Sequence, residues 1–246
     1  MKVACAHQAM SGLFRPFFPD LTVLGSNRFP SDLNLLILTG GSDINPARYG
    51  EKVAGSVGID NNRDEIEHSH ITSARMRNVK VLGVCRGFQL LNIEFGGSLV
   101  QDMYMNKMEH RAAHSLTWAD GVLIPQILMT NSMHHQAVTS SRCSATRVLA
   151  TEPDTKVIEA AMWGDQCLGV QWHPEFFMPD KAHEFFNFIK EWVEGKVNIV
   201  ETKPRPEPKL DIGNDALRKK LRYESLFANR SESVFGQARL LTKGDE

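Results

Sequence analysis

The chain has 246 residues, 42% of them hydrophobic and 23% charged, which is the composition of a globular protein and excludes a collagenous or disordered one. Lys and Arg total 28 against 29 Asp and Glu, so a nucleic-acid partner, which usually demands a basic surplus, is not expected. No stretch approaches the roughly 18 consecutive apolar residues of a membrane span, so no membrane partner is expected either.

The first part of the chain alternates strand and helix patterns. Continuous apolar runs predict buried strands of a parallel sheet, because both faces of such a sheet are covered. These runs lie at 3–6, 21–24, 33–38 and 79–84, and helical periodicity appears at 63–76, 88–95 and 181–193. Only residues 8–20 can connect the first two strands, and Pro16 and Pro19 argue against a full-length helix there. We expect an α/β fold with a mostly parallel central sheet flanked by helices.

The stretch between residues 116 and 172 has a different pattern. Short apolar runs alternate with turn residues, which is typical of antiparallel strands. The runs lie at 122–124, 147–150, 157–163 and 167–172. We therefore expect part of this stretch to form an antiparallel edge of the sheet.

Charge and composition change near Gly195. Residues 196–246 hold 11 Lys and Arg against 8 Asp and Glu, a net charge of +3, whereas residues 1–195 have a net charge of −4. Segment 203–209 alternates proline with charge, which favours an extended linker, and an apolar stripe over 214–227 predicts a short docking helix. We expect a catalytic domain over 1–195 and a C-terminal extension over 196–246, made of the linker and a short helical tail.

The four cysteines indicate a reducing compartment. Cys5, Cys85, Cys143 and Cys167 are widely scattered and include no CxxC pair. The apolar run at the N-terminus meets His7 before it reaches the length of a signal peptide. We expect a cytoplasmic protein.

One cysteine lies in a distinctive turn. Residues 80–84 read as a buried strand that leads through Gly83-Val84-Cys85-Arg86-Gly87 into a periodic helix. Small residues on both sides of the cysteine permit a nucleophile elbow, which exposes the side chain at the carboxyl end of the sheet. The N-terminus of the following helix favours a thiolate. The alternative is a small buried cysteine in a glycine-rich turn.

A second pattern supplies a base. An apolar strand ends at His173-Pro174-Glu175, and residues two apart on an extended segment point the same way, so Glu175 can orient His173. An imidazole beside a thiol can remove its proton and later protonate a leaving amine. Cys85, His173 and Glu175 are therefore candidate catalytic residues.

Both patterns resemble those of the class I, triad-type glutamine amidotransferases. Residues 84–92 (Val-Cys-Arg-Gly-Phe-Gln-Leu-Leu-Asn) and 171–175 (Gln-Trp-His-Pro-Glu) carry the resemblance. The Cys-Arg-Gly variant is similar to the γ-glutamyl hydrolase-like branch, of peptidase C26 type, which includes γ-glutamyl-GABA and folylpoly-γ-glutamate hydrolases. Segments 38–46, 60–67 and 131–138 also match that branch. The resemblance covers residues 1–195 and implies a flavodoxin-like glutamine amidotransferase fold, although the Gly40-Gly41 pair comes earlier in the chain than is usual.

The resemblance also implies roles for individual residues. Cys85 would be the nucleophile, His173 the general base and acid, and Glu175 the residue that orients the imidazole. The backbone N–H groups of Gly41 and Arg86 would form the oxyanion hole.

Further residues have weaker assignments. The resemblance implies that Gln89 holds the glutamyl group and that His135 lines the pocket. Arg63, Asp64 and Glu67 share a predicted helix face, so a capping or ion-pair role competes with substrate contact. No cofactor is expected, and the histidines lack partners at a familiar zinc spacing, so no metal is expected.

Three functions fit these patterns. The first is a hydrolase that cleaves a γ-glutamyl amide of a small amine through a Cys85 thioester and releases glutamate. The second is a glutaminase that delivers ammonia to a partner synthetase docked through the tail. The third is a non-catalytic binding protein, against which the intact Cys85, His173 and Glu175 argue. The Cys-Arg-Gly and His-His-Gln motifs favour the hydrolase, whereas the tail favours a synthetase partner or self-association.

Overall fold

The computed structural model describes residues 1–108, 113–140 and 146–201 of the chain. The linker at 203–209, the tail helix over 214–227 and Cys143 lie outside these residues. The domain boundary after Gly195 therefore stays a prediction.

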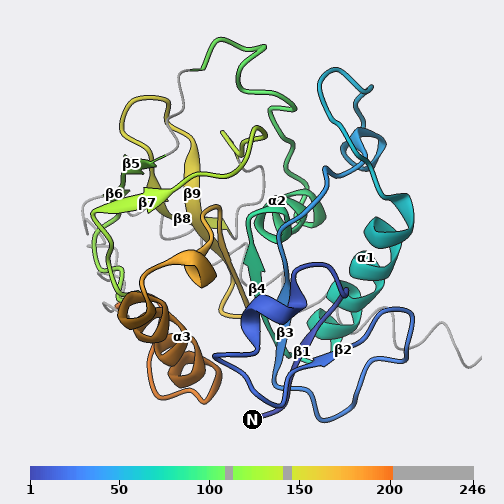
Figure 1. Cartoon of the computed structure of the whole chain (residues 1–246), viewed down its shortest axis with the longest axis vertical. Helices are drawn as coiled ribbons and strands as arrows, with labels where there is room; N and C mark the ends of the chain where they lie inside the picture. The colour runs from blue at the N-terminus through green and yellow to red at the C-terminus, as the bar shows by residue number, and fades with distance from the viewer. Residues whose placement is uncertain (109–112, 141–145, 202–246) are drawn as a thin grey trace, which may run out of the picture. The chain divides into compact units, whose positions relative to one another are not determined.

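Within the described residues, eight strands form one mixed sheet in the order β2-β1-β3-β4-β10-β9-β8-β6 (Figure 1). The strands are β1 (Val3–Cys5), β2 (Thr22–Val23), β3 (Leu35–Leu38), β4 (Lys80–Val84), β6 (Thr117–Trp118), β8 (Thr146–Thr151), β9 (Ile158–Trp163) and β10 (Cys167–Val170). The five strands from β2 to β10 run parallel, whereas β9, β8 and β6 continue the sheet antiparallel. The expected mostly parallel sheet with an antiparallel edge is confirmed.

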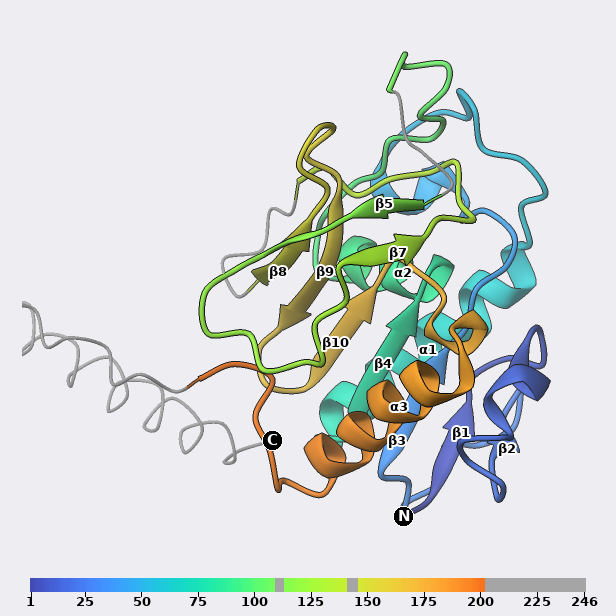
Figure 2. The ribbon, with the colours of Figure 1, turned by 60° about the vertical axis from the view of Figure 1, so that its left-hand side comes forward.

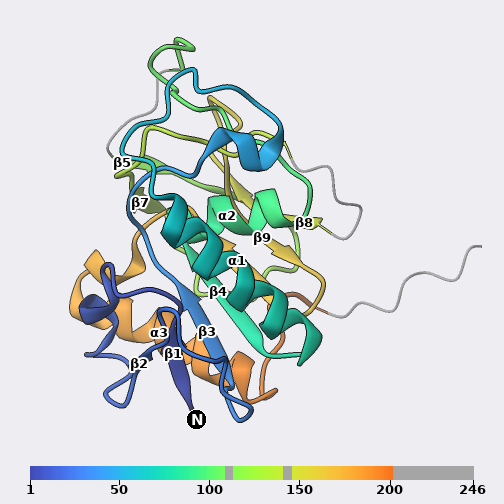
Figure 3. The ribbon, with the colours of Figure 1, turned by 90° about the vertical axis from the view of Figure 1, so that its right-hand side faces the viewer.

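Helices cover both faces of this sheet (Figures 2 and 3). Helices α1 (Asn61–Met76) and α2 (Arg86–Glu94) pack on one face, and α3 (Pro179–Val193) packs on the other. Alternate residues of each strand point into the two resulting cores, as Cys5 and Ala4 of β1 do. The carboxyl ends of the parallel strands are thereby fixed between two apolar layers.

The connection between β1 and β2 is short, as the sequence indicated. It holds a 3₁₀ helix, η1 (Ser11–Phe14), instead of an α-helix. The rings of Phe14, Phe17 and Phe18 pack on Phe186 of α3 with centroid separations of 5.8, 4.1 and 5.8 Å. Aromatic packing thus covers the part of the sheet that a longer helix would cover.

The expected strand at 122–124 is wrong. Val122 makes only an isolated bridge with Val200, and Ile199 beside it is buried, so residues after Gly195 pack on this edge. A separate two-stranded sheet, β5 (Ala113–Ser115) with β7 (Met129–Asn131), was not expected. These strands span three residues each and are partly exposed, which is too short for a period of two to show.

Candidate active site

Cys85 lies in a sharp turn between β4 and α2, at the carboxyl end of a central strand. Its φ and ψ are 53° and −107°, a combination that is rare for a residue with a side chain and typical of strained functional turns. Its N–H donates to the carbonyl oxygen of Val170 at 2.8 Å, so β10 holds the turn. The conformation is that of a nucleophile elbow.

The glycines beside Cys85 are required by close packing. A Cβ on Gly87 would lie 2.2 Å from the carbonyl oxygen of Leu38, and a Cβ on Gly83 would lie 2.6 Å from the carbonyl oxygen of Gly87. Both obstacles are backbone atoms, which cannot rotate away as a side chain can. The elbow is therefore locked between β3 and α2.

His173 and Glu175 follow β10 and lie beside the cysteine. The Nδ1 atom of His173 is 2.7 Å from Oε1 of Glu175, and both side chains are buried. Burial by itself lowers the pKa of His173, but hydrogen bonds with Cys85 and Glu175 raise it to about 10. Because Glu175 occupies Nδ1, Nε2 is the ring nitrogen that stays available to a reacting group. The three expected catalytic side chains therefore lie together, in an arrangement that favours a protonated imidazole at His173.

Replacement of Glu175 by glutamine is expected to lower the pKa of His173. The amide carries no charge to stabilise the imidazolium, whereas in the natural protein the ring titrates at about 10. Since this pKa lies above the ordinary value of 6.5, the imidazolium stabilises the fold fully below pH 6.5, and this contribution is lost as the pH rises through about 10. NMR titration of the labelled ring measures the midpoint.

The matched control is Glu184→Gln, which removes an exposed carboxylate of α3 that pairs with Lys181. It should leave the midpoint of His173 where it is. An unchanged midpoint in Glu175→Gln would show that Glu175 does not orient a charged imidazole.

Asn131 clamps the backbone of His173. Its Oδ1 accepts a hydrogen bond from the N–H of His173 at 2.9 Å, and its Nδ2 donates to the carbonyl oxygen of the same residue at 2.9 Å. Asn131 ends β7, so the small second sheet reaches the candidate site. Asn131 belongs to segment 131–138, which resembles the γ-glutamyl hydrolase-like branch, but the sequence predicted no role for it. Its place in that segment was the only indication of a role.

The Gly40-Gly41 pair lies between the imidazole and a buried arginine. A Cβ on Gly40 would lie 2.6 Å from Cε1 of His173, and a Cβ on Gly41 would lie 2.1 Å from Nη1 of Arg63. Gly41 also has a φ of 144°, a value that side chains disfavour. Arg86 begins α2, and its N–H has no acceptor within the helix. The roles of these two N–H groups as oxyanion donors stay predictions.

Gln89 and His135 are both held by other groups of the protein. Gln89 is buried, and its Nε2 donates to the carbonyl oxygen of Gln136 at 3.2 Å and to Oε1 of Gln171 at 3.1 Å. Nε2 of His135 is 2.9 Å from Oδ2 of Asp43. A substrate contact by either residue stays a prediction.

Metal-ligating clusters, surface cavities and membrane-spanning helices were also considered for the described residues. No group of three or more His, Cys, Asp or Glu side chains lies together there in a way that would hold a metal ion. A surface cavity of about 640 Å³ lies next to the turn at Gly164, which joins β9 to the amino end of β10, and is therefore at the opposite end of that strand from His173. In the same part of the chain, no helix has the length and apolarity to cross a membrane.

The mixed sheet, the elbow at Cys85 and the adjacent His173-Glu175 pair define a glutamine amidotransferase-like α/β protein. The chain belongs to the Peptidase C26 family, which matches residues 26–175, more than half of its length. The resemblance seen in the sequence is thereby confirmed.

Three relatives are between 29% and 31% identical to this chain. A glutamine amidotransferase-like protein of Lactococcus lactis, YvdE, is 31% identical over 196 residues, which cover 71% of this chain and 82% of that protein. A Schizosaccharomyces pombe protein named as a candidate glutamine amidotransferase is 29% identical over 202 residues, covering 74% and 79%. The γ-glutamyl-γ-aminobutyrate hydrolase PuuD of Escherichia coli is 30% identical over 158 residues, covering 55% and 61%.

Solved structures share the fold at lower identity. The glutaminase domain of Trypanosoma brucei CTPS superimposes with a TM-score of 0.54 at 15% identity, covering 82% of this chain and 97% of that one. A candidate GMP synthase component from Thermoplasma acidophilum gives a TM-score of 0.55 at 15% identity, covering 80% and 96%. These likenesses show the fold alone.

Proposed function

We propose that the protein is a cysteine-dependent hydrolase that cleaves a γ-glutamyl amide bond of a small amine and releases glutamate. The observation that carries the proposal is the elbow at Cys85 next to the buried pair of His173 and Glu175, in which Nδ1 of the imidazole is 2.7 Å from Oε1 of the carboxylate. The likeness to the E. coli γ-glutamyl-γ-aminobutyrate hydrolase supports the substrate class. No cofactor enters the proposed reaction.

In the first half of the proposed reaction, the thiolate of Cys85 attacks the carbonyl carbon of the γ-amide and forms a C–S bond. The carbonyl oxygen takes the negative charge, and the N–H groups of Gly41 and Arg86 stabilise it. The C–N bond then breaks as the imidazolium of His173 gives its proton to the departing amine. A glutamyl thioester and a neutral imidazole remain.

In the second half, water attacks the thioester while His173 accepts its proton. The C–S bond breaks, glutamate leaves, and the thiolate and imidazolium are restored. The high pKa of His173 suits its role as the acid in the first half, because the ring is protonated at neutral pH. Glu175 supports both halves by keeping the ring in one orientation.

The second candidate is a glutaminase that supplies ammonia to a synthetase. The fold likeness to the CTPS glutaminase domain supports it, as does the extension after Gly195, which would dock the partner or a second copy of the chain. A cytoplasmic location fits both candidates, since the described cysteines Cys5, Cys85 and Cys167 are free thiols.

Mass-spectrometric measurement of glutamate release by the full chain separates the two candidates. The panel contains glutamine, γ-glutamyl-γ-aminobutyrate and other γ-glutamyl amines. We expect the purified chain to turn over at least one γ-glutamyl amine about 10 times faster than glutamine or more, without any partner. A chain that hydrolyses only glutamine, and only in the presence of a copurifying synthetase, would overturn the hydrolase proposal and support the glutaminase.

A further inference from the structure

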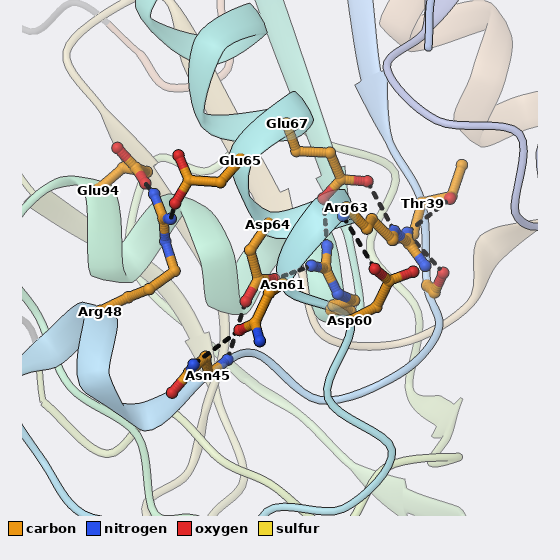
Figure 4. A network of polar contacts seen from close by, with 12 residues as sticks. Thr39, Asn45, Arg48, Asp60, Asn61, Arg63, Asp64, Glu65, Glu67 and Glu94 are labelled. Carbon is orange, nitrogen blue, oxygen red and sulfur yellow. Dashed lines mark hydrogen bonds and ion pairs between the residues drawn. The ribbon is translucent and has the colours of Figure 1, made fainter. Parts of the chain in front are cut away.

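Four buried charges form a network beside the Gly40-Gly41 loop. Arg63, Asp64 and Glu67 lie on α1 (Figure 4). Arg86 begins α2, and each of the four side chains is at most 1% exposed. Nε of Arg63 donates to Glu67 at 2.9 Å, and Arg86 pairs with both Glu67 and Asp64. The ion-pair alternative for these α1 residues is confirmed. Two positive and two negative groups balance, which is what buried charges require.

Arg63 extends this network to the loop after β3. Its Nη2 donates to the carbonyl oxygen of Thr39 at 3.0 Å, to Oγ1 of Thr39 at 3.1 Å and to the carbonyl oxygen of Gly40 at 3.0 Å. The guanidinium also fills the space that a side chain on Gly41 would need. Only the planar fork of arginine can bind Glu67 through one nitrogen and two backbone carbonyls through another.

This contact fixes the direction of the Gly41 N–H. In a planar trans peptide, the C=O and N–H groups point in opposite directions. A guanidinium that holds the carbonyl oxygen of Gly40 therefore turns the N–H of Gly41 away from Arg63. A carbonyl bound to a cation also polarises its peptide, which makes the N–H a stronger donor.

The same network fixes the second expected oxyanion donor. The N–H of Arg86 belongs to a residue whose own side chain is bound to Asp64 and Glu67 of α1. Both donors are thus attached to one helix, Gly41 through Arg63 and Arg86 directly. We propose that Arg63 is a positioning residue of the oxyanion hole, which sets the place of the Gly41 N–H relative to that of Arg86. The proposal rests on the proposed function.

Arg63→Lys tests the proposal, because lysine keeps the charge and loses the fork. The probe is γ-glutamyl-p-nitroanilide, with the full chain. Loss of one oxyanion donor typically costs about 10²–10³ in kcat, so we expect kcat to fall by about 100-fold while KM stays within about threefold. Alkylation of Cys85 by iodoacetamide forms no oxyanion, and its rate should stay within about twofold of the natural protein.

Arg48→Lys is the matched control. Arg48 lies in the 3₁₀ helix η2 (Pro46–Tyr49), and its side chain makes ion pairs with Glu65 of α1 and Glu94 of α2, at 2.7 and 3.2 Å (Figure 4). Within the described residues, this side chain makes no hydrogen bond with Thr39 or Gly40, the two residues that Arg63 binds. Both rates should be unchanged in this variant. If Arg63→Lys does not fold, Glu67→Gln is measured instead for turnover of the anilide and for alkylation of Cys85. Glutamine weakens the hydrogen bond to Nε of Arg63, so kcat should fall by about 10-fold while the alkylation rate is kept.

The outcomes separate the two proposals. An unchanged kcat in Arg63→Lys, or an equal loss of alkylation and turnover, would overturn the positioning role and leave the hydrolase intact. A natural protein that turns over neither the anilide nor any γ-glutamyl amine would overturn the proposed function and the positioning role with it.

Discussion

Replacement of Cys85 by alanine is expected to lower kcat/KM for a γ-glutamyl amide by about 10⁴-fold or more, since loss of a nucleophile removes the covalent route entirely. The side chain is small and 5% exposed, and alanine fits the same volume, so the fold should survive. Intact-mass measurement after rapid acid quenching should show a glutamyl adduct on the natural protein and none on the variant.

The controls are Cys5→Ala and Cys167→Ala. Burial raises the pKa of each of these thiols to about 12, so neither forms a thiolate at neutral pH. Both variants should keep full turnover and the adduct. Turnover and an adduct that survive in Cys85→Ala would remove Cys85 from the mechanism.

Gly87→Ala is expected to cause the largest loss of stability. The new Cβ would lie 2.2 Å from the carbonyl oxygen and 2.6 Å from the Cβ of Leu38, so β3 and α2 must move apart. Overpacking of this kind costs about 3 kcal/mol of unfolding free energy or more, which is a large share of the stability of an ordinary domain. Urea unfolding, followed by circular dichroism, measures the loss.

Gly12→Ala provides the comparison, because no atom lies within 4 Å of the position where its Cβ would stand. Its free energy of unfolding should match that of the natural protein to within about 0.5 kcal/mol. A Gly87→Ala protein as stable as Gly12→Ala would mean that the elbow is not packed against β3.

The central strands were predictable because burial on both faces leaves a continuous apolar run. Residues 33–38 and 79–84 show such runs, and β3 and β4 lie within them. Strands β5, β6 and β7 escaped prediction because two or three residues carry no usable period. The three candidate catalytic residues were predictable as well, because Cys85, His173 and Glu175 each lie in a short local motif.

The contacts that Asn131 and Arg63 make with distant segments were not predictable. Asn131 binds the backbone of a residue 42 positions away, and Arg63 binds a loop 23 and 24 positions before it. Helical spacing indicated that Arg63 and Glu67 share a face. Helical spacing could not identify Arg86 of α2 as the further partner of Glu67. The sequence does not indicate whether a charged side chain is buried.

The insertion of β10 between β4 and β9 has a consequence for synthesis of the chain. Cys85 emerges from the ribosome long before His173, yet the thiol acquires its imidazole only when β10 has paired with β4. A pairing over such a sequence separation is intrinsically slow. The nascent cysteine therefore lacks its imidazole until β10 pairs with β4, and on refolding, the appearance of rapid thiol reactivity should coincide with that pairing.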